Sequence, residues 1–128
     1  MHKLQKHETT LDGRPIVSKT MAKNVHCSPR KVRLVANLIR NKSVAEALDI
    51  LTFTVKPAAV PYVTKCVKAA IAAAREFVPN EAELADLIVG EVIVNDAPMM
   101  KRIRPATMGR AVRIRRRQSH IFLALTKD

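Results

Sequence analysis

The 128-residue sequence contains few aromatic residues, few glycines and no long apolar run. Its glycines Gly13, Gly90 and Gly109 are scattered, which excludes a phosphate-cradling loop or a dinucleotide fingerprint. Aromatic residues make up 3% of the chain, so readout of bases stacked on a sheet platform is not supported. Apolar runs fall far below the roughly 18 residues that span a bilayer, and the N-terminus lacks a signal-peptide stretch. We expect a soluble, intracellular protein without a membrane partner.

Cysteine is also scarce, and the spacing of Cys27 and Cys66 does not fit a metal knuckle. Each cysteine falls in an apolar helical pattern, so we interpret both as core residues, with a disulfide or a metal site as the alternative. His26 precedes Cys27, but no C-x-x-C motif or second histidine at helical spacing accompanies the pair. We therefore expect no metal and no cofactor.

Positive charge is abundant, with 23 Lys and Arg against 11 Asp and Glu and a formal net charge of +12. Such self-repulsion disfavours the free compact state, so a large anionic partner is expected. The candidates are nucleic acid and an anionic membrane, and we expect nucleic acid because no membrane partner is expected. The charge is segregated. Residues 14–45 and 97–126 carry no acid, and they flank a mildly acidic stretch from 46 to 96. The length allows one domain with a modest core.

Three helices are predicted before residue 78. Ser28 is a plausible N-cap with Pro29 at the first helical position, and apolar residues then recur at helical spacing to Ile39. Ser43 and Glu46 form an approximate capping box for a second helix, and a third of about 16 residues follows Pro61. On the polar side of the first helix, phosphate contact is favoured over a solvated face because no acids lie nearby; these residues are Lys31, Arg33, Asn37 and Arg40.

After a turn signal at 78–83, two β-branched runs predict strands at 86–96 and 119–126. If both continue, residues 97–118 form a long hairpin with its turn near Pro105 to Gly109, where Gly109 can take a positive φ. Each arm would project roughly 30 Å. Residues 101–120 hold eight basic side chains and no acid, and seven of the eight are arginine. A bare hairpin is marginal in water, so contact with phosphate is favoured over a solvated arm.

Three stretches, "SPRKVRLVANLIRNKSVAEALDIL", "AAIAAA" and "MKRIRPATMGRAVRIRRRQSHI", resemble the bacterial-type L-twenty-two family of large-subunit ribosomal proteins from about Lys23 to the C-terminus. The resemblance implies an α+β fold of three helices packed on a three-stranded antiparallel sheet, with a long protruding basic β-hairpin. It divides the chain into an N-terminal extension, 1–22, and a single domain, 23–128. It also implies a non-enzymatic protein of the cytoplasmic ribosome, with an organellar ribosome as the alternative.

The resemblance further implies that the protein binds large-subunit ribosomal RNA, aids assembly, touches neighbouring ribosomal proteins and lines the nascent-peptide exit tunnel with its hairpin tip. The residues expected to bind RNA are Lys23, Ser28, Arg30, Lys31, Arg33, Arg40, Lys42, Lys101, Arg102, Arg104, Arg110, Arg113, Arg115, Arg116, Arg117, Ser119 and His120. The residues expected at the tunnel-lining tip are Met100, Lys101, Arg102, Pro105, Ala106, Thr107, Met108, Gly109 and Arg110.

Two features depart from the family pattern. Ala106 and Met108 stand where relatives usually carry a basic residue, so the charge at the tip is expected to be reduced. The leader of about 20 residues exceeds the usual length, and Met21 is a possible alternative start.

Two other function classes remain open. An architectural DNA-bending protein also uses basic β-arms with a proline near the tip. An enzyme would need a poised acid/base pair, and the only acids near a strand with His120 opposite are Asp86, Glu91 and Asp96. We interpret His120 as a residue that packs or contacts RNA.

Overall fold

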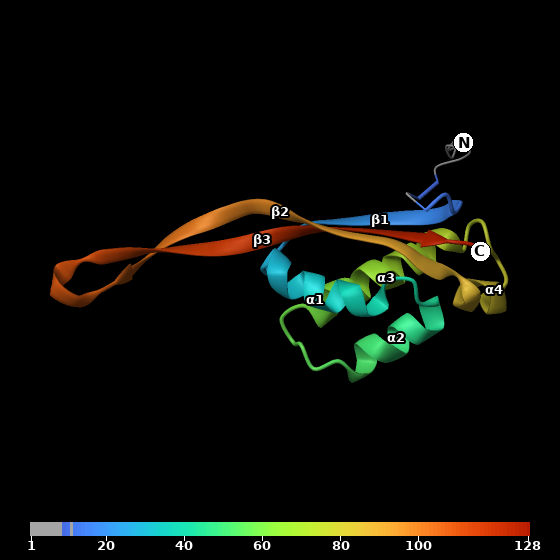
Figure 1. Ribbon diagram of the computed structural model, residues 1–128, viewed down its shortest axis with the longest axis horizontal. Helices are drawn as coiled ribbons and strands as arrows, with labels where there is room; N and C mark the ends of the chain where they lie inside the picture. Colours follow the sequence, from blue (N-terminus) through green and yellow to red (C-terminus); the bar gives the residue numbers. More distant parts are fainter. Residues whose placement is uncertain (1–8, 11) are drawn as a thin grey trace.

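The computed structural model describes residues 9, 10 and 12–128, and within them the chain has the expected α+β fold (Figure 1). The elements in chain order are β1 (Ile16–Val25), α1 (Pro29–Ile39), α2 (Val44–Phe53), α3 (Val60–Ala74), α4 (Glu81–Asp86), β2 (Ile88–Pro105), the 3-10 turn η1 (Thr107–Gly109) and β3 (Ala111–Thr126).

The sheet has three antiparallel strands in the order β1-β3-β2, so β3 is central and β2 is an edge strand. β1 is the strand that the residue pattern did not locate. Ile16 pairs with Thr126 and Val25 with Ser119, so β1 runs along the globular half of β3. The boundary drawn at residue 22 therefore cuts through β1, and residues 16–22 belong to the sheet.

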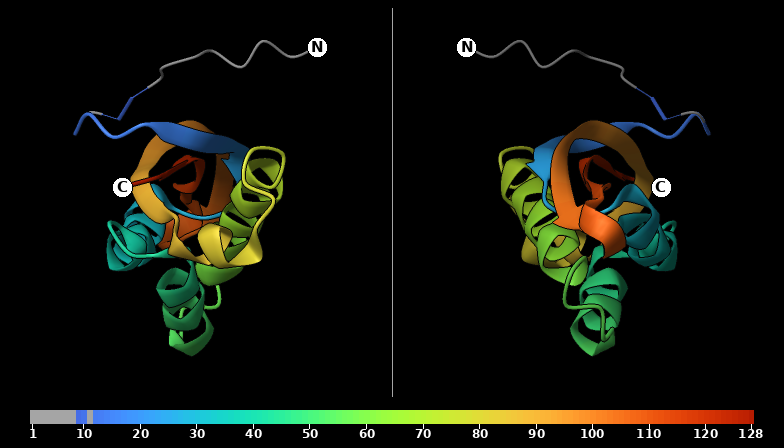
Figure 2. Two further views of the ribbon diagram at one scale, coloured as in Figure 1. Left: turned by 90° about the vertical axis from the view of Figure 1, so that its right-hand side faces the viewer. Right: turned by 90° about the vertical axis from the view of Figure 1, so that its left-hand side faces the viewer.

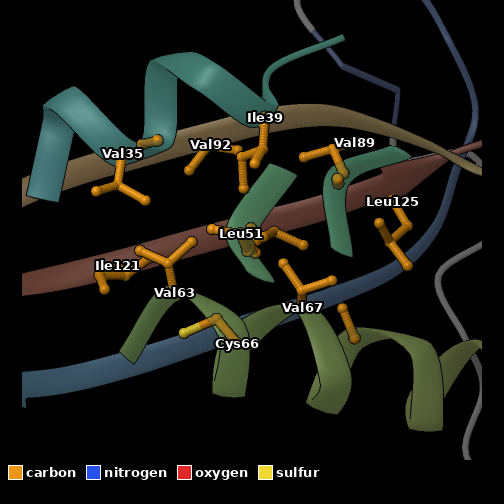
Figure 3. Close-up of a cluster of buried hydrophobic side chains, with 14 of the residues drawn as sticks. Val35, Ile39, Leu51, Val63, Cys66, Val67, Val89, Val92, Ile121 and Leu125 are labelled. Carbon is orange, nitrogen blue, oxygen red and sulfur yellow. The ribbon is translucent and has the colours of Figure 1, made fainter. Parts of the chain in front are cut away.

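Helices α1 to α4 lie on one side of the sheet, below it in Figure 1 and beneath β1 in both views of Figure 2. The core fills the space between this helical layer and the sheet. Figure 3 shows Val35 and Ile39 of α1 and Val63 and Val67 of α3 pointing into the space between the two helices. Ile121 and Leu125 of the central strand point into the same space. Cys27 and Cys66 are buried and unpaired thiols, which confirms their interpretation as core residues.

The predicted helix starts hold. Ser28 is the N-cap of α1 with Pro29 in its first turn, although the Ser28 side chain makes no capping hydrogen bond. Ser43 caps α2 because its Oγ accepts a hydrogen bond of 3.3 Å from the Glu46 N–H. α3 has 15 residues, close to the expected 16.

The prediction of a simple turn between α3 and β2 is wrong. Residues 81–86 form the short helix α4, which Asn80 caps by accepting a hydrogen bond from the Ala82 N–H. Glu81 and Glu83 in its first turn suit the positive end of the helix dipole. The described residues thus contain four α-helices where three were expected.

Candidate nucleic-acid interface

The predicted hairpin is present and extends away from the globular part as two long, twisted ribbons (Figure 1). β2 and β3 stay paired from Ile88↔Thr126 to Pro105↔Ala111. Beyond the Asp96↔Ser119 pair, residues 97–105 extend the arm by about 30 Å at 3.3 Å per residue. One extra residue on β2 between Ala97 and Met100 makes a β-bulge at the root of the arm, and bulges increase the local twist.

The turn lies where it was predicted. The Ala106 N–H donates to the Arg110 carbonyl at 2.7 Å, and η1 closes the reversal. Gly109 has φ +67°, as expected, but Met108 also adopts φ +60°, which the sequence did not indicate. The Met108 side chain is 94% exposed at the far end of the molecule. An uncharged thioether is therefore almost fully exposed at the tip.

Positive charge covers both faces of the arm. Alternation along paired strands places Lys101 with Arg113 and Arg115 on one face, around a hollow of about 410 Å³. It places Arg102 and Arg104 with Arg116 on the other face, around a hollow of about 620 Å³. Each face also carries apolar side chains between the charged ones. These are Met99 and Ile103 on the face with Lys101, and Met100, Val112 and Ile114 on the face with Arg102. The arm thus has no uncharged side.

A third hollow, of about 690 Å³, lies at the root of the arm and joins two segments that the sequence separates by almost ninety positions. The loop before α1 contributes His26, Cys27 and Ser28, and α1 contributes Lys31. The arm contributes Met100, Arg115, Arg116, Arg117 and Gln118. We call this hollow the root pocket. The predicted basic helix start and the predicted basic hairpin form one continuous surface there.

Hydrogen bonding and burial set the electrostatics of the root pocket. A 3.1 Å hydrogen bond joins Gln118 Nε2 and His26 Nδ1 across it. Burial raises the pKa of the Cys27 thiol, although Lys31 opposes the shift, so the thiol stays neutral at pH 7. The charge that the pocket offers a ligand therefore comes from Lys31 and the arginines.

Arg33 and Arg40 were expected on a phosphate-binding face, but the structure turns both toward β2. Arg33 Nε and Nη2 donate to the Val94 carbonyl at 3.3 and 3.0 Å, and Arg40 Nη2 donates to the Val92 carbonyl at 2.8 Å. These carbonyls belong to an edge strand, and no further strand of the described residues pairs with that edge. The two arginines therefore tie α1 to the sheet.

The other predicted sites divide by burial. Ser119 is fully buried, and within the described residues its Oγ has no hydrogen-bond partner, so it offers no surface for a phosphate. His120 is half-buried, and its Nδ1 accepts a 3.1 Å hydrogen bond from the Asn24 N–H. Lys23, Arg30 and Lys42 are exposed. All the predicted tip residues lie along the outer arm or its turn.

Comparison with known proteins agrees with this geometry. Residues 20–126 match the family described as ribosomal protein L22p/L17e. The chain belongs to this family. Among curated relatives, the large ribosomal subunit protein uL22 of Desulfitobacterium hafniense (strain Y51) is 46% identical over 110 residues, which cover 86% of this chain and 94% of the relative. Members of this family are structural, non-enzymatic proteins of the large ribosomal subunit.

No helix in the described part of the chain is long and apolar enough to cross a membrane.

Proposed function

We propose that this L22-family protein binds large-subunit ribosomal RNA through the arm, the root pocket and the exposed basic residues Lys23, Arg30 and Lys42. The single observation that carries the proposal is the positive charge on both faces of an arm with no core of its own. An arm that lay on a surface would need charge on one face only. Charge on both faces fits an arm that RNA surrounds, with arginine matching phosphate geometry.

The proposal extends to the tip. The arm holds η1 far from the globular domain, and family membership supports a place for that tip in the wall of the nascent-peptide exit tunnel (Figure 1). Pro105 fixes φ before the turn, and the left-handed conformations of Met108 and Gly109 set the reversal. Because Ala106 and Met108 carry no charge, the tip presents a less basic wall to the nascent peptide than the tips of relatives do.

Neighbouring ribosomal proteins contact the globular part, and the protein acts in the cytoplasmic ribosome.

The RNA interface is tested by the salt dependence of binding to a large-subunit ribosomal RNA transcript. Each phosphate neutralised by Lys or Arg contributes somewhat under one unit of log-log slope. Replacing Arg113, Arg115 and Arg117 together by Gln should therefore flatten the slope by about two units. An unchanged slope would assign these arginines to solvent, and tighter binding to duplex DNA at matched salt would favour an architectural DNA-binding protein instead.

The tunnel placement needs a separate test. Deleting Met100, Lys101 and Arg102 removes an odd number of residues from one strand, which reverses the faces beyond the deletion and displaces the tip. The root pocket and globular domain keep their other contacts, so the variant should still enter large subunits. Cells with only this variant should change in macrolide sensitivity and in stalling on an arrest-peptide reporter. Parental behaviour of both, with the variant in every large subunit, would exclude the tip from the tunnel wall.

A further inference from the structure

The side of the sheet that faces away from the helices carries an apolar row across all three strands. Met21 of β1 pairs with Phe122 of β3, and Phe122 pairs with Ile93 of β2, so the three side chains lie side by side. Their neighbours in sequence, Leu123 and Val92, point into the core and are buried, which fixes the row on the opposite face. We call this set the outer row.

The outer row is open to solvent. Met21 is 50% exposed, Ile93 is 40% exposed, and Phe122 between them is half-buried. No described helix covers this side, because α1 to α4 all lie on the other (Figures 1 and 2). The solvent face of an antiparallel sheet is normally polar, so three adjacent apolar side chains at its centre indicate a surface that something covers.

The groups beside the outer row identify the chemistry of that cover. Toward the arm, the next positions on this face are Lys23, His120 and Asn95. His120 accepts the Asn24 N–H at Nδ1, which places the proton of the neutral ring on Nε2 as a donor. On the other flank Lys19 and Glu91 lie on either side of Ala124 and add no net charge. A flat apolar centre thus has hydrogen-bond donors on the flank nearest the arm.

The outer row ends close to the root pocket. Beyond His120 on β3, the next alternate positions are Gln118 and Arg116, and both line the root pocket. Gln118 is buried and hydrogen-bonded to His26, and Lys31 of α1 lines the same hollow, so the strands twist between the outer row and the arm. RNA bound in the root pocket would therefore lie within a few residues of His120 and the outer row.

We propose that an unpaired nucleotide of the bound RNA stacks on the outer row, with its base or ribose against Phe122 and its phosphate near Lys23 and His120. This inference rests on the proposed RNA-binding function and adds a contact that is not ionic. Aromatic content alone argued against base stacking, but strand pairing places one of the three phenylalanines at the centre of the open face. A single aromatic ring between apolar neighbours is enough for one base, because every base has a stacking face.

A photocrosslinker tests what covers the row. p-Benzoylphenylalanine in place of Met21, in full-length protein assembled into large subunits, should crosslink to ribosomal RNA on irradiation. The same residue in place of Phe53, which is 83% exposed at the end of α2 on the helical side, serves as the position control. Crosslinks from position 21 to another protein, to this chain itself, or to nothing would overturn the proposal.

Binding measurements separate this inference from the general RNA function. Phe122→Leu keeps an apolar side chain and loses the ring, so affinity for the large-subunit RNA transcript should fall roughly five- to tenfold while the salt slope stays unchanged. Phe53→Leu should bind as the parent does. If the parent and the triple arginine variant both fail to bind, the proposed function is wrong. If the parent binds, the triple variant weakens and Phe122→Leu binds like the parent, only the stacking contact is wrong.

Discussion

Lys101 and Arg115 lie directly opposite one another on the two strands of the hairpin. Two like charges at paired positions destabilise a sheet, and residues 97–126 contain no acid that could offset them. The arm therefore keeps an unfavourable pair in the free protein, and an anion removes the cost. The repulsion within this pair is one local example of the self-repulsion expected from the net charge of +12 on the whole chain.

Reversing one charge of this pair should separate folding of the arm from binding. Lys101→Glu places a carboxylate opposite Arg115 and should stabilise the free hairpin by about 0.2–1 kcal/mol. It should also weaken binding to large-subunit RNA, because a phosphate contact becomes a repulsion. Amide hydrogen exchange of the arm and RNA affinity measure the two effects, and Lys101→Gln shows the loss of charge alone. An RNA affinity equal to that of the parent would place position 101 away from phosphate.

Arg33 should matter for stability even without RNA. Arg33→Ala removes both hydrogen bonds to the Val94 carbonyl and should lower the free energy of unfolding by about 1 kcal/mol. Arg30→Ala, three positions earlier on an exposed part of the same helix, should change it by less than about 0.5 kcal/mol. Urea unfolding of the two variants makes the comparison. Equal stabilities would show that the bonds to β2 contribute nothing measurable.

Gly90 should tolerate no side chain. A Cβ at this position would lie 2.5 Å from Thr126 Cγ2 and 2.7 Å from its Oγ1, and Thr126 is fully buried. Gly90→Ala should therefore destabilise the fold by about 1–3 kcal/mol, the range for overpacked cores. Thermal unfolding of the single variant and of Gly90→Ala with Thr126→Ala tests the cause. The double variant should recover part of the loss, and failure to do so would point to backbone conformation rather than to the clash.

A chain that begins at Met21 should fold less stably than the full chain. It lacks Ile16 to Thr20, which pair with the last strand, and it lacks the 2.8 Å hydrogen bond from Ser18 Oγ to the Ala70 carbonyl of α3. The expected loss is at least about 2 kcal/mol, of which Ser18→Ala should reproduce about 1 kcal/mol. The measurement is the midpoint of urea unfolding of the full chain, of the chain that begins at Met21 and of Ser18→Ala. Equal midpoints for the full and shortened chains would make the first half of β1 dispensable.

Local sequence signals were sufficient for α1 and for the arm. Ser28 and Pro29 mark a helix start by their own conformational preferences, and the arm shows period-two alternation with a glycine at its turn. β1 gave no such signal because it places a polar residue on the core side and an apolar residue on the outer side. Ser18 lies in the interior, where its Oγ finds a backbone acceptor, while Met21 lies on the outer face. A polar residue on the core side removes the alternation that a strand prediction depends on.

The sequence predicted which segments of the candidate site are basic, but it did not predict which of their residues lie together in space. An excess of arginine without acids identified the basic segments, because that observation needs no structure. Lys31 and Arg117 line the same root pocket from opposite parts of the sequence, and no local pattern encodes that arrangement. For the same reason the sequence did not show that Arg33 and Arg40 have carbonyl acceptors on β2, which only the position of that edge strand reveals.

The strands of the outer arm pair without interruption from Met100↔Arg116 to Pro105↔Ala111. Any insertion or deletion of paired residues would therefore move the tip by a whole number of residue rises. Removing one residue from each strand would shorten the arm by about 3.3 Å and also exchange its two faces, so every arginine beyond that point would meet the opposite side of its surroundings. Removing two from each strand would restore the faces at a cost of about 6.6 Å in length. Changes of arm length that keep the arginines facing the same surroundings therefore come in whole pleats of two residues per strand. Finer adjustment of the tip falls to the side chains of the turn.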